Sequence, residues 1–125
     1  DSDGDADIFI ASLSGPDRLL LNNGAGVFTL SAAATPNDTP GSLGVAAADL
    51  DGDGRLDLVI SNTDANSVSV LRGQGDGAFS VAAEQAAARR PLDVNVADLD
   101  RDGRLDVLLL NDTSGSFSVL RGTHE

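Results

Sequence analysis

The sequence predicts an all-β fold, a β-propeller segment of about two and a half four-stranded blades. It contains an internal repeat, because ADLDGDGRLDLVI at 48–60 returns as ADLDRDGRLDVLL at 97–109, and DSDGDADIFI at 1–10 aligns with 51–60. Each unit consists of short apolar or alternating runs broken by Gly, Asp and Asn, which is the pattern of strands and turns. The period of ~50 residues suits one propeller blade.

Ten antiparallel strands are expected, near residues 7–11, 18–22, 28–32, 45–49, 57–61, 68–72, 79–83, 93–97, 106–110 and 117–121. They form a partial blade at 1–34, a complete blade at 44–85 and a second partial blade at 93–125. Between these units lie two expected loops, 35–43 and 86–92, the first because TPNDTPGSL is rich in turn-forming residues.

The predicted number of blades has consequences for assembly. A propeller ring needs at least ~4 blades, so two and a half cannot close it. We therefore expect the chain to be part of a larger propeller or to assemble with copies of itself. Its expected partners are neighbouring propeller blades or those copies. Since Met is absent, even at position 1, we expect a processed form or an excerpt of a longer protein.

The composition excludes several functions. There are 20 acidic and 8 basic residues, so the net charge is −12. A field of this sign excludes nucleic-acid binding by phosphate neutralisation and argues against attachment to anionic lipid. The absence of Cys excludes disulfides, Cys-ligated zinc and a thiol nucleophile. No apolar run approaches the ~20 residues of a membrane span, so membrane insertion is not expected.

Acidic residues gather in three loops, which hold 12 of the 20. Two loops are complete, with Asp at loop positions 1, 3, 5 and 9: Asp49, Asp51, Asp53 and Asp57, then Asp98, Asp100, Asp102 and Asp106. Such crowding is repulsive unless a cation offsets it. Hard oxygen ligands favour Ca²⁺ over zinc or copper, so the sequence predicts two calcium sites.

The remaining loop positions complete this prediction. The backbone carbonyls of Arg55 and Arg104 at position 7 are expected further ligands. Gly54 and Gly103 at position 6 permit the left-handed turn that aims the ligands inward. An EF-hand is excluded, because it needs a bidentate Glu at position 12, where these loops have an apolar residue in a strand.

The first loop is incomplete. Asp1, Asp3 and Asp7 occupy positions 3, 5 and 9, Asp5 fills position 7, and position 1 would precede residue 1. We expect a weaker calcium site there. Bound Ca²⁺ is expected to stabilise the loops rather than to take part in catalysis. Two alternatives are acidic turns that are simply solvated and a halophilic surface.

Other residues are expected to play structural roles. Phe28 and Phe79 are predicted to pack one blade on the next, and Phe9 and Phe117 to do the same. The glycine-rich segments 24–26 and 73–77 are predicted to be hairpin turns rather than phosphate loops, because neither opens a helix. His124 is the only His and is expected to be idle, so no Ser-His-Asp or Cys-His set is available.

These motifs resemble the FG-GAP/VCBS repeat family, the calcium-loop blades of integrin-α-like propellers. The resemblance rests on DLDGDGRLD at 49–57, the apolar strand after it and GDGAF at 75–79, while NNGAGVF at 22–28 looks like the bacterial variant. It implies a propeller, often of seven blades, with Ca²⁺ between the first and second strands of a blade, in secreted or surface proteins. It does not imply one activity.

The leading functional hypothesis is a non-enzymatic, calcium-stabilised propeller segment of an extracellular or cell-surface protein, with no catalytic residues. It would be a scaffold for adhesion to, or binding of, a cell-surface protein or a glycan. One alternative is an accessory or partly catalytic propeller of a polysaccharide-active lyase or hydrolase, and another is a purely architectural spacer. The low aromatic content, 3%, weakens a lectin role, because sugar sites favour aromatic platforms.

Overall fold

The computed structural model describes residues 1, 3–31, 41–87, 89–112 and 115–122. In this part the chain forms ten antiparallel strands and no helix, which confirms the predicted all-β class. The strands are β1 (Ile8–Ile10), β2 (Arg18–Asn22), β3 (Phe28–Leu30), β4 (Ser42–Ala48), β5 (Asp57–Asn62), β6 (Ser67–Gly73), β7 (Phe79–Ala86), β8 (Pro91–Ala97), β9 (Asp106–Asn111) and β10 (Phe117–Leu120). Residues 35–40 of the first expected loop and His124 lie outside the described residues.

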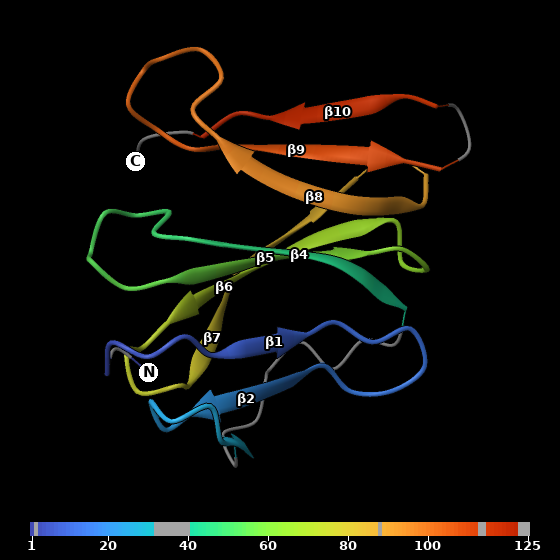
Figure 1. Ribbon diagram of the computed structural model, residues 1–125. Helices are drawn as coiled ribbons and strands as arrows, with labels where there is room; N and C mark the ends of the chain where they lie inside the picture. Colours follow the sequence, from blue (N-terminus) through green and yellow to red (C-terminus); the bar gives the residue numbers. More distant parts are fainter. Residues whose placement is uncertain (2, 32–40, 88, 113–114, 123–125) are drawn as a thin grey trace.

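The strands form three sheets that lie one above another (Figure 1). The first sheet has the order β1-β2-β3, the central sheet β4-β5-β6-β7 and the third sheet β10-β9-β8. In every sheet the neighbours are consecutive in the sequence, which is the up-and-down connectivity expected of a propeller blade. The glycine-rich segments predicted to be hairpin turns, 24–26 and 73–77, do join β2 to β3 and β6 to β7. The second turn spans 74–78, because Gly73 is the last residue of β6.

Several strands are longer than predicted. β4 begins at Ser42, three residues early, and β8 at Pro91, two residues early, so the ends of both expected loops belong to strands. A register shift follows the first residue of each, between Ser42 and Gly44 and between Pro91 and Asp93. A bulge of this kind breaks the period-two alternation, and the sequence pattern therefore places the strand start too late. β7 extends to Ala86, three residues further than expected.

β5 lies at the centre of the structure, and all six of its residues are buried. Leu58 and Ile60 contact the first sheet through a cluster that includes Phe9. Val59 points to the opposite face and packs against Leu109 of the third sheet. Because both faces of β5 are covered, the strand needs apolar side chains on both, and its sequence is a continuous apolar run.

The four phenylalanines divide into two pairs. Phe9 and Phe79 meet edge to face between the first and central sheets, with ring centroids 6.4 Å apart, which confirms their predicted packing role. The prediction was wrong for Phe28 and Phe117, which are 40% and 71% exposed. Both lie on the outer faces of the stack, where none of the described residues forms a further sheet. Their sequence pattern repeats that of the central sheet, but among the described residues no neighbouring sheet covers them.

Candidate metal centres

The second acidic loop joins β4 to β5 and is folded by its own carboxylates. Asp49 Oδ1 accepts hydrogen bonds from the backbone amides of Gly52 (2.8 Å) and Asp53 (3.1 Å), and Asp49 Oδ2 accepts one from Gly54 (2.9 Å). Only a short side chain can return to its own backbone in this way. Gly54 has φ +85°, which confirms the left-handed turn predicted at position 6.

The third acidic loop joins β8 to β9 and repeats this pattern. Asp98 accepts hydrogen bonds from the amides of Asp102 (3.1 Å) and Gly103 (2.9 Å), and Gly103 has φ +86°. Arg101 takes the place of Gly52 at position 4 and adopts the same left-handed conformation, with φ +62°. The backbone therefore follows the same path in both loops, although a non-glycine residue in this left-handed conformation costs roughly 1–2 kcal/mol.

Each complete loop brings three carboxylates together. One oxygen of each carboxylate lies within 4.8 Å of the others in two triplets, Asp49, Asp51 and Asp57, and Asp98, Asp100 and Asp106. These are loop positions 1, 3 and 9. The donors are all hard oxygens, so their chemistry fits a hard cation such as Ca²⁺ better than zinc or copper.

The carboxylates at position 9 also hold the sheet together. Asp57 is 2% exposed; its Oδ2 accepts the amide of Leu50 and its Oδ1 the amide of Gly73, both at 2.9 Å. Asp106 is 1% exposed and makes the same bonds, at 2.9 Å, with Leu99 and Gly122. Each residue therefore ties the start of its acidic loop to a glycine at the end of β6 (Gly73) or just after β10 (Gly122).

The carboxylates at position 5 lie outside the triplets. Asp53 Oδ1 accepts the amide of Arg55 at 2.8 Å, and Asp102 Oδ1 accepts that of Arg104 at 2.9 Å. These bonds shape the turn at positions 5 to 7. Ligation by Asp53 and Asp102, and by the carbonyls of Arg55 and Arg104, stays a prediction.

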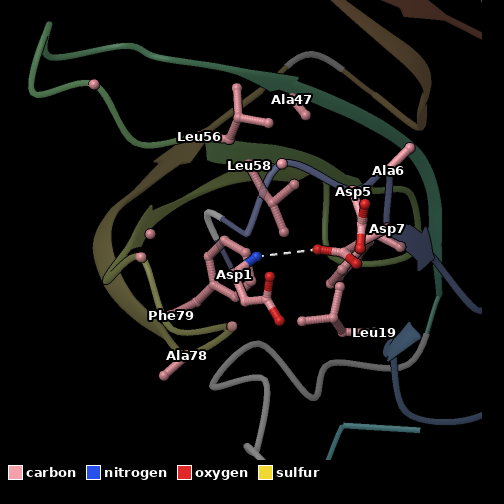
Figure 2. Close-up of a pocket in the computed structure, with 16 residues that line it drawn as sticks. Asp1, Asp5, Ala6, Asp7, Leu19, Ala47, Leu56, Leu58, Ala78 and Phe79 are labelled. Carbon is pink, nitrogen blue, oxygen red and sulfur yellow. Dashed lines mark hydrogen bonds and ion pairs between the residues drawn. The ribbon is translucent and has the colours of Figure 1, made fainter. Parts of the chain in front are cut away.

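The first loop has part of this architecture. Asp7 Oδ1 accepts the amide of Asn22 at 2.9 Å, as Asp57 and Asp106 do with their glycines. Its Oδ2 is 3.0 Å from the α-ammonium of Asp1, a contact that Figure 2 shows. Among the described residues, Asp1, Asp3, Asp5 and Asp7 form no triplet like the other two.

A cavity of about 670 Å³ lies beside this first loop (Figure 2). Apolar and acidic side chains share its wall, among them Leu19, Leu58, Phe79, Asp5 and Asp7. The described residues that line it include no His, Lys or Tyr. The acidic groups of the first loop therefore share this cavity with apolar side chains.

Two arginines beside the triplets were not anticipated from the sequence. Arg72 Nε lies 2.9 Å from Asp51 Oδ2, and Arg121 Nη1 lies 3.7 Å from Asp100 Oδ2. The signal was present, because Val-Leu-Arg-Gly occurs at 70–73 and again at 119–122. Each guanidinium offsets part of the repulsion at position 3 of its loop.

Hydrogen bonding favours the ionised form of three of these acids. Amides of Gly122 and Leu99 hold the pKa of Asp106 below its ordinary value. The amide of Gly54 does the same for the pKa of Asp49. Burial raises the pKa of Asp7, but the Asn22 amide and the α-ammonium outweigh it, and the net shift is downward.

These shifts predict loss of stability in acid. A carboxyl with a lowered folded-state pKa stabilises the fold fully above its unfolded pKa, ~3.9 for Asp, and loses that contribution as pH falls through the folded value. We expect the free energy of unfolding in urea, measured with chelator, to fall from about pH 4 downward. The Asp106→Asn variant should show a shallower fall than the wild type. Equal slopes would contradict this role of Asp106.

Comparison with known families agrees with the repeat seen in the sequence. The FG-GAP-like repeat model matches residues 1–60 and 49–109. The two matches together cover all three acidic loops, and they confirm the resemblance drawn from the motifs. No curated protein matches the chain. Within the described ranges there is no helix long and apolar enough to cross a bilayer.

Proposed function

Because this chain belongs to the FG-GAP-like repeat family, we propose that it is a calcium-stabilised β-propeller segment. The two complete acidic loops each hold one Ca²⁺. The observation that carries this proposal is the pair of carboxylate triplets, which recur at the same loop positions in two repeats. Repetition of a repulsive arrangement is expected where a bound cation offsets the repulsion.

The ligands follow from the geometry and from the motif. In the central sheet, Asp49, Asp51 and Asp57 would hold the ion. Asp53 and the carbonyl of Arg55 would complete its shell. The third sheet uses the equivalent residues, and the first loop is the weaker site. The bound ion would offset the repulsion among the carboxylates of the loop.

The functional role that fits these features is a rigid binding scaffold. FG-GAP-like repeats occur in extracellular or surface proteins. Extracellular calcium modules bind with dissociation constants of about 10⁻⁴–10⁻³ M, which suits an environment rich in calcium. We propose that the loops of this extracellular, non-enzymatic segment bind a cell-surface protein or a glycan.

The alternative role in a polysaccharide-active enzyme needs groups that can donate and accept protons at one place. The described cavity beside the first loop combines carboxylates with apolar side chains. Carboxylates that hold Ca²⁺ stay ionised and make poor general acids. No arrangement in the described residues therefore favours this alternative.

A calcium-dependent thermal melt tests the proposal. Ca²⁺ in ten- to hundredfold excess over its dissociation constant should stabilise the fold by roughly 1.4–2.7 kcal/mol per site. We expect a matching rise in Tm relative to chelator, followed by circular dichroism. The double variant Asp51→Ala/Asp100→Ala should lose most of this rise.

Asp76→Ala is the matched control, because Asp76 is an exposed acid in the β6–β7 turn, outside the acidic loops. It should keep the full response to calcium. A β-rich fold whose melting ignores calcium would instead support solvated turns or a halophilic surface. An unchanged calcium response in the double variant would also contradict the assigned ligands.

A further inference from the structure

Two neighbouring residues at the end of β6 contact two carboxylates of the triplet in the second acidic loop. The Gly73 amide donates to Asp57 Oδ1 at 2.9 Å, and Arg72 Nε lies 2.9 Å from Asp51 Oδ2. Asp51 and Asp57 are positions 3 and 9 of the loop, and both belong to the triplet. The carboxylate that pairs with Arg72 is therefore also a proposed ligand of the calcium ion.

The third sheet repeats this arrangement at an offset of 49 residues. The Gly122 amide donates to Asp106 Oδ1 at 2.9 Å, and Arg121 Nη1 lies 3.7 Å from Asp100 Oδ2. In both sheets, then, the glycine serves position 9 of the loop and the arginine serves position 3.

The first sheet has a leucine in the place of this arginine. Its Asn22 amide donates to Asp7 Oδ1 at 2.9 Å, as the two glycines do in their sheets. The residue before Asn22 is Leu21, where the other sheets have Arg72 and Arg121. The arginine therefore accompanies the two loops that form a carboxylate triplet among the described residues.

The position-3 carboxylates are held in place without the arginines. Asp51 Oδ1 accepts the backbone amide of Asp53 at 3.2 Å, and Asp100 Oδ1 accepts that of Asp102 at the same distance. These bonds fix each carboxylate from within its own loop. The main contribution of Arg72 is therefore its positive charge, which opposes any cation that approaches Asp51.

We propose that Arg72 and Arg121 are built-in counter-ions that weaken calcium binding at the two sites. In the ion-free loop, the guanidinium offsets part of the repulsion among the carboxylates. When Ca²⁺ binds, the ion and the guanidinium share one carboxylate and repel each other, so the affinity is lower. The loops then fill where calcium is abundant and keep their fold where it is scarce. This inference rests on the proposed calcium sites and adds how their affinity is set.

The two arginines should differ in the size of this effect. Arg72 lies closer to its carboxylate than Arg121 does, and its side chain is 53% exposed against 76% for Arg121. Water and salt screen exposed charges and weaken their interactions. We expect calcium binding to tighten about three- to tenfold when the Arg72 charge is removed, and less than about threefold for Arg121.

Calorimetric titration of the 125-residue chain with CaCl₂ tests the proposal at one site. An Asp100→Ala parent disables the third loop, so that the main binding event reports on the central one. In this parent, Arg72→Gln removes the charge but keeps a long polar side chain, and it should bind Ca²⁺ more tightly. Arg72→Lys keeps the charge and should bind like the parent. The advantage of Arg72→Gln should shrink as NaCl rises from about 0.02 to 0.5 M.

Arg89→Gln is the matched control. Arg89 is an exposed arginine between β7 and β8, at the end of the central sheet opposite the acidic loop. The substitution removes the same charge from the chain and should leave the calcium affinity unchanged.

Thermal melts give a second readout. In chelator, Arg72→Gln should melt about 1–3 °C below the parent, because the loop loses its counter-ion. Calcium should narrow this difference, since tighter binding to the variant and its lower stability without the ion are linked. An equal difference in chelator and in calcium would contradict the coupling between Arg72 and the ion.

The outcomes separate this inference from the proposed function. A parent chain that takes up no calcium in the calorimeter contradicts both. A parent that binds Ca²⁺, with Arg72→Gln binding equally well or more weakly, overturns the inference alone, because the arginine then only positions Asp51. An Arg72→Lys chain that binds as tightly as Arg72→Gln also overturns it, because the charge would then play no part.

Discussion

Replacing Asp57 with Ala is expected to lower the free energy of unfolding by about 3 kcal/mol in chelator, and by more in calcium, because the variant also loses a proposed ligand of the bound ion. Asp57 is 2% exposed and accepts the amides of Leu50 and Gly73. Its loss leaves two backbone donors without a partner, and each unsatisfied buried donor costs about 1–3 kcal/mol. Urea unfolding followed by circular dichroism measures the change.

Asp76→Ala serves as the comparison for this substitution. Asp76 also accepts a backbone amide, that of Ala78 at 3.0 Å, but in an exposed turn where water can replace it. We expect a loss of no more than about 0.5 kcal/mol there. If Asp57→Ala behaves like Asp76→Ala in chelator, the position-9 carboxylate serves the metal alone and does not tie the sheet.

This double role of Asp57 explains why the sequence predicted the site only in part. The spacing predicted that the carboxylates at positions 1, 3, 5 and 9 meet in each loop, and those at positions 1, 3 and 9 do so. A tight loop keeps side chains within a few residues of one another, which is why the sequence was enough for this part. The partner Gly73 lies 16 residues away. Register between β5 and β6 brings it close, and the loop motif carries no information on that register.

Arg72 was missed for a related reason. Its position in Val-Leu-Arg-Gly reads as the end of an ordinary strand, and only the fold places its guanidinium 2.9 Å from Asp51. Recurrence of the same pair as Arg121 and Asp100 is the clue that the sequence did hold. The equal offset of 49 residues shows that both motifs belong to one repeating unit, and the ion pairs show that they are neighbours in space.

The fold was easier to predict than its exposed surfaces. Apolar runs and turn residues located all ten strands, because those signals act over five or six residues. Errors arose where distant parts decide the outcome. Bulges displaced the starts of β4 and β8, and the cover over Phe28 and Phe117 depends on what lies beyond the described sheets. Local pattern determines which face is apolar, but not whether that face is buried.

Gly73→Ala is the second substitution for which we expect a severe effect, a loss on the order of 3 kcal/mol. Gly73 ends β6, and a Cβ there would collide with the carbonyl oxygen of Leu56, a backbone atom that cannot swing away. The backbone shift needed to relieve this collision would also pull the Gly73 amide away from Asp57 Oδ1. The expected loss of stability comes from the lack of room for a Cβ, because Gly73 does not have a positive φ.

Gly15→Ala is the matched control, because Gly15 also lacks a positive φ and a Cβ there would meet only Ser12 Oγ, at an ordinary 3.6 Å. We expect a change of less than about 1 kcal/mol for it. The double variant Asp57→Ala/Gly73→Ala should lose less free energy of unfolding than the sum of the two single losses, because both substitutions break the same hydrogen bond. Additive losses would show that the two residues act separately, and a Gly73→Ala protein as stable as Gly15→Ala would show that β6 can move away from Leu56.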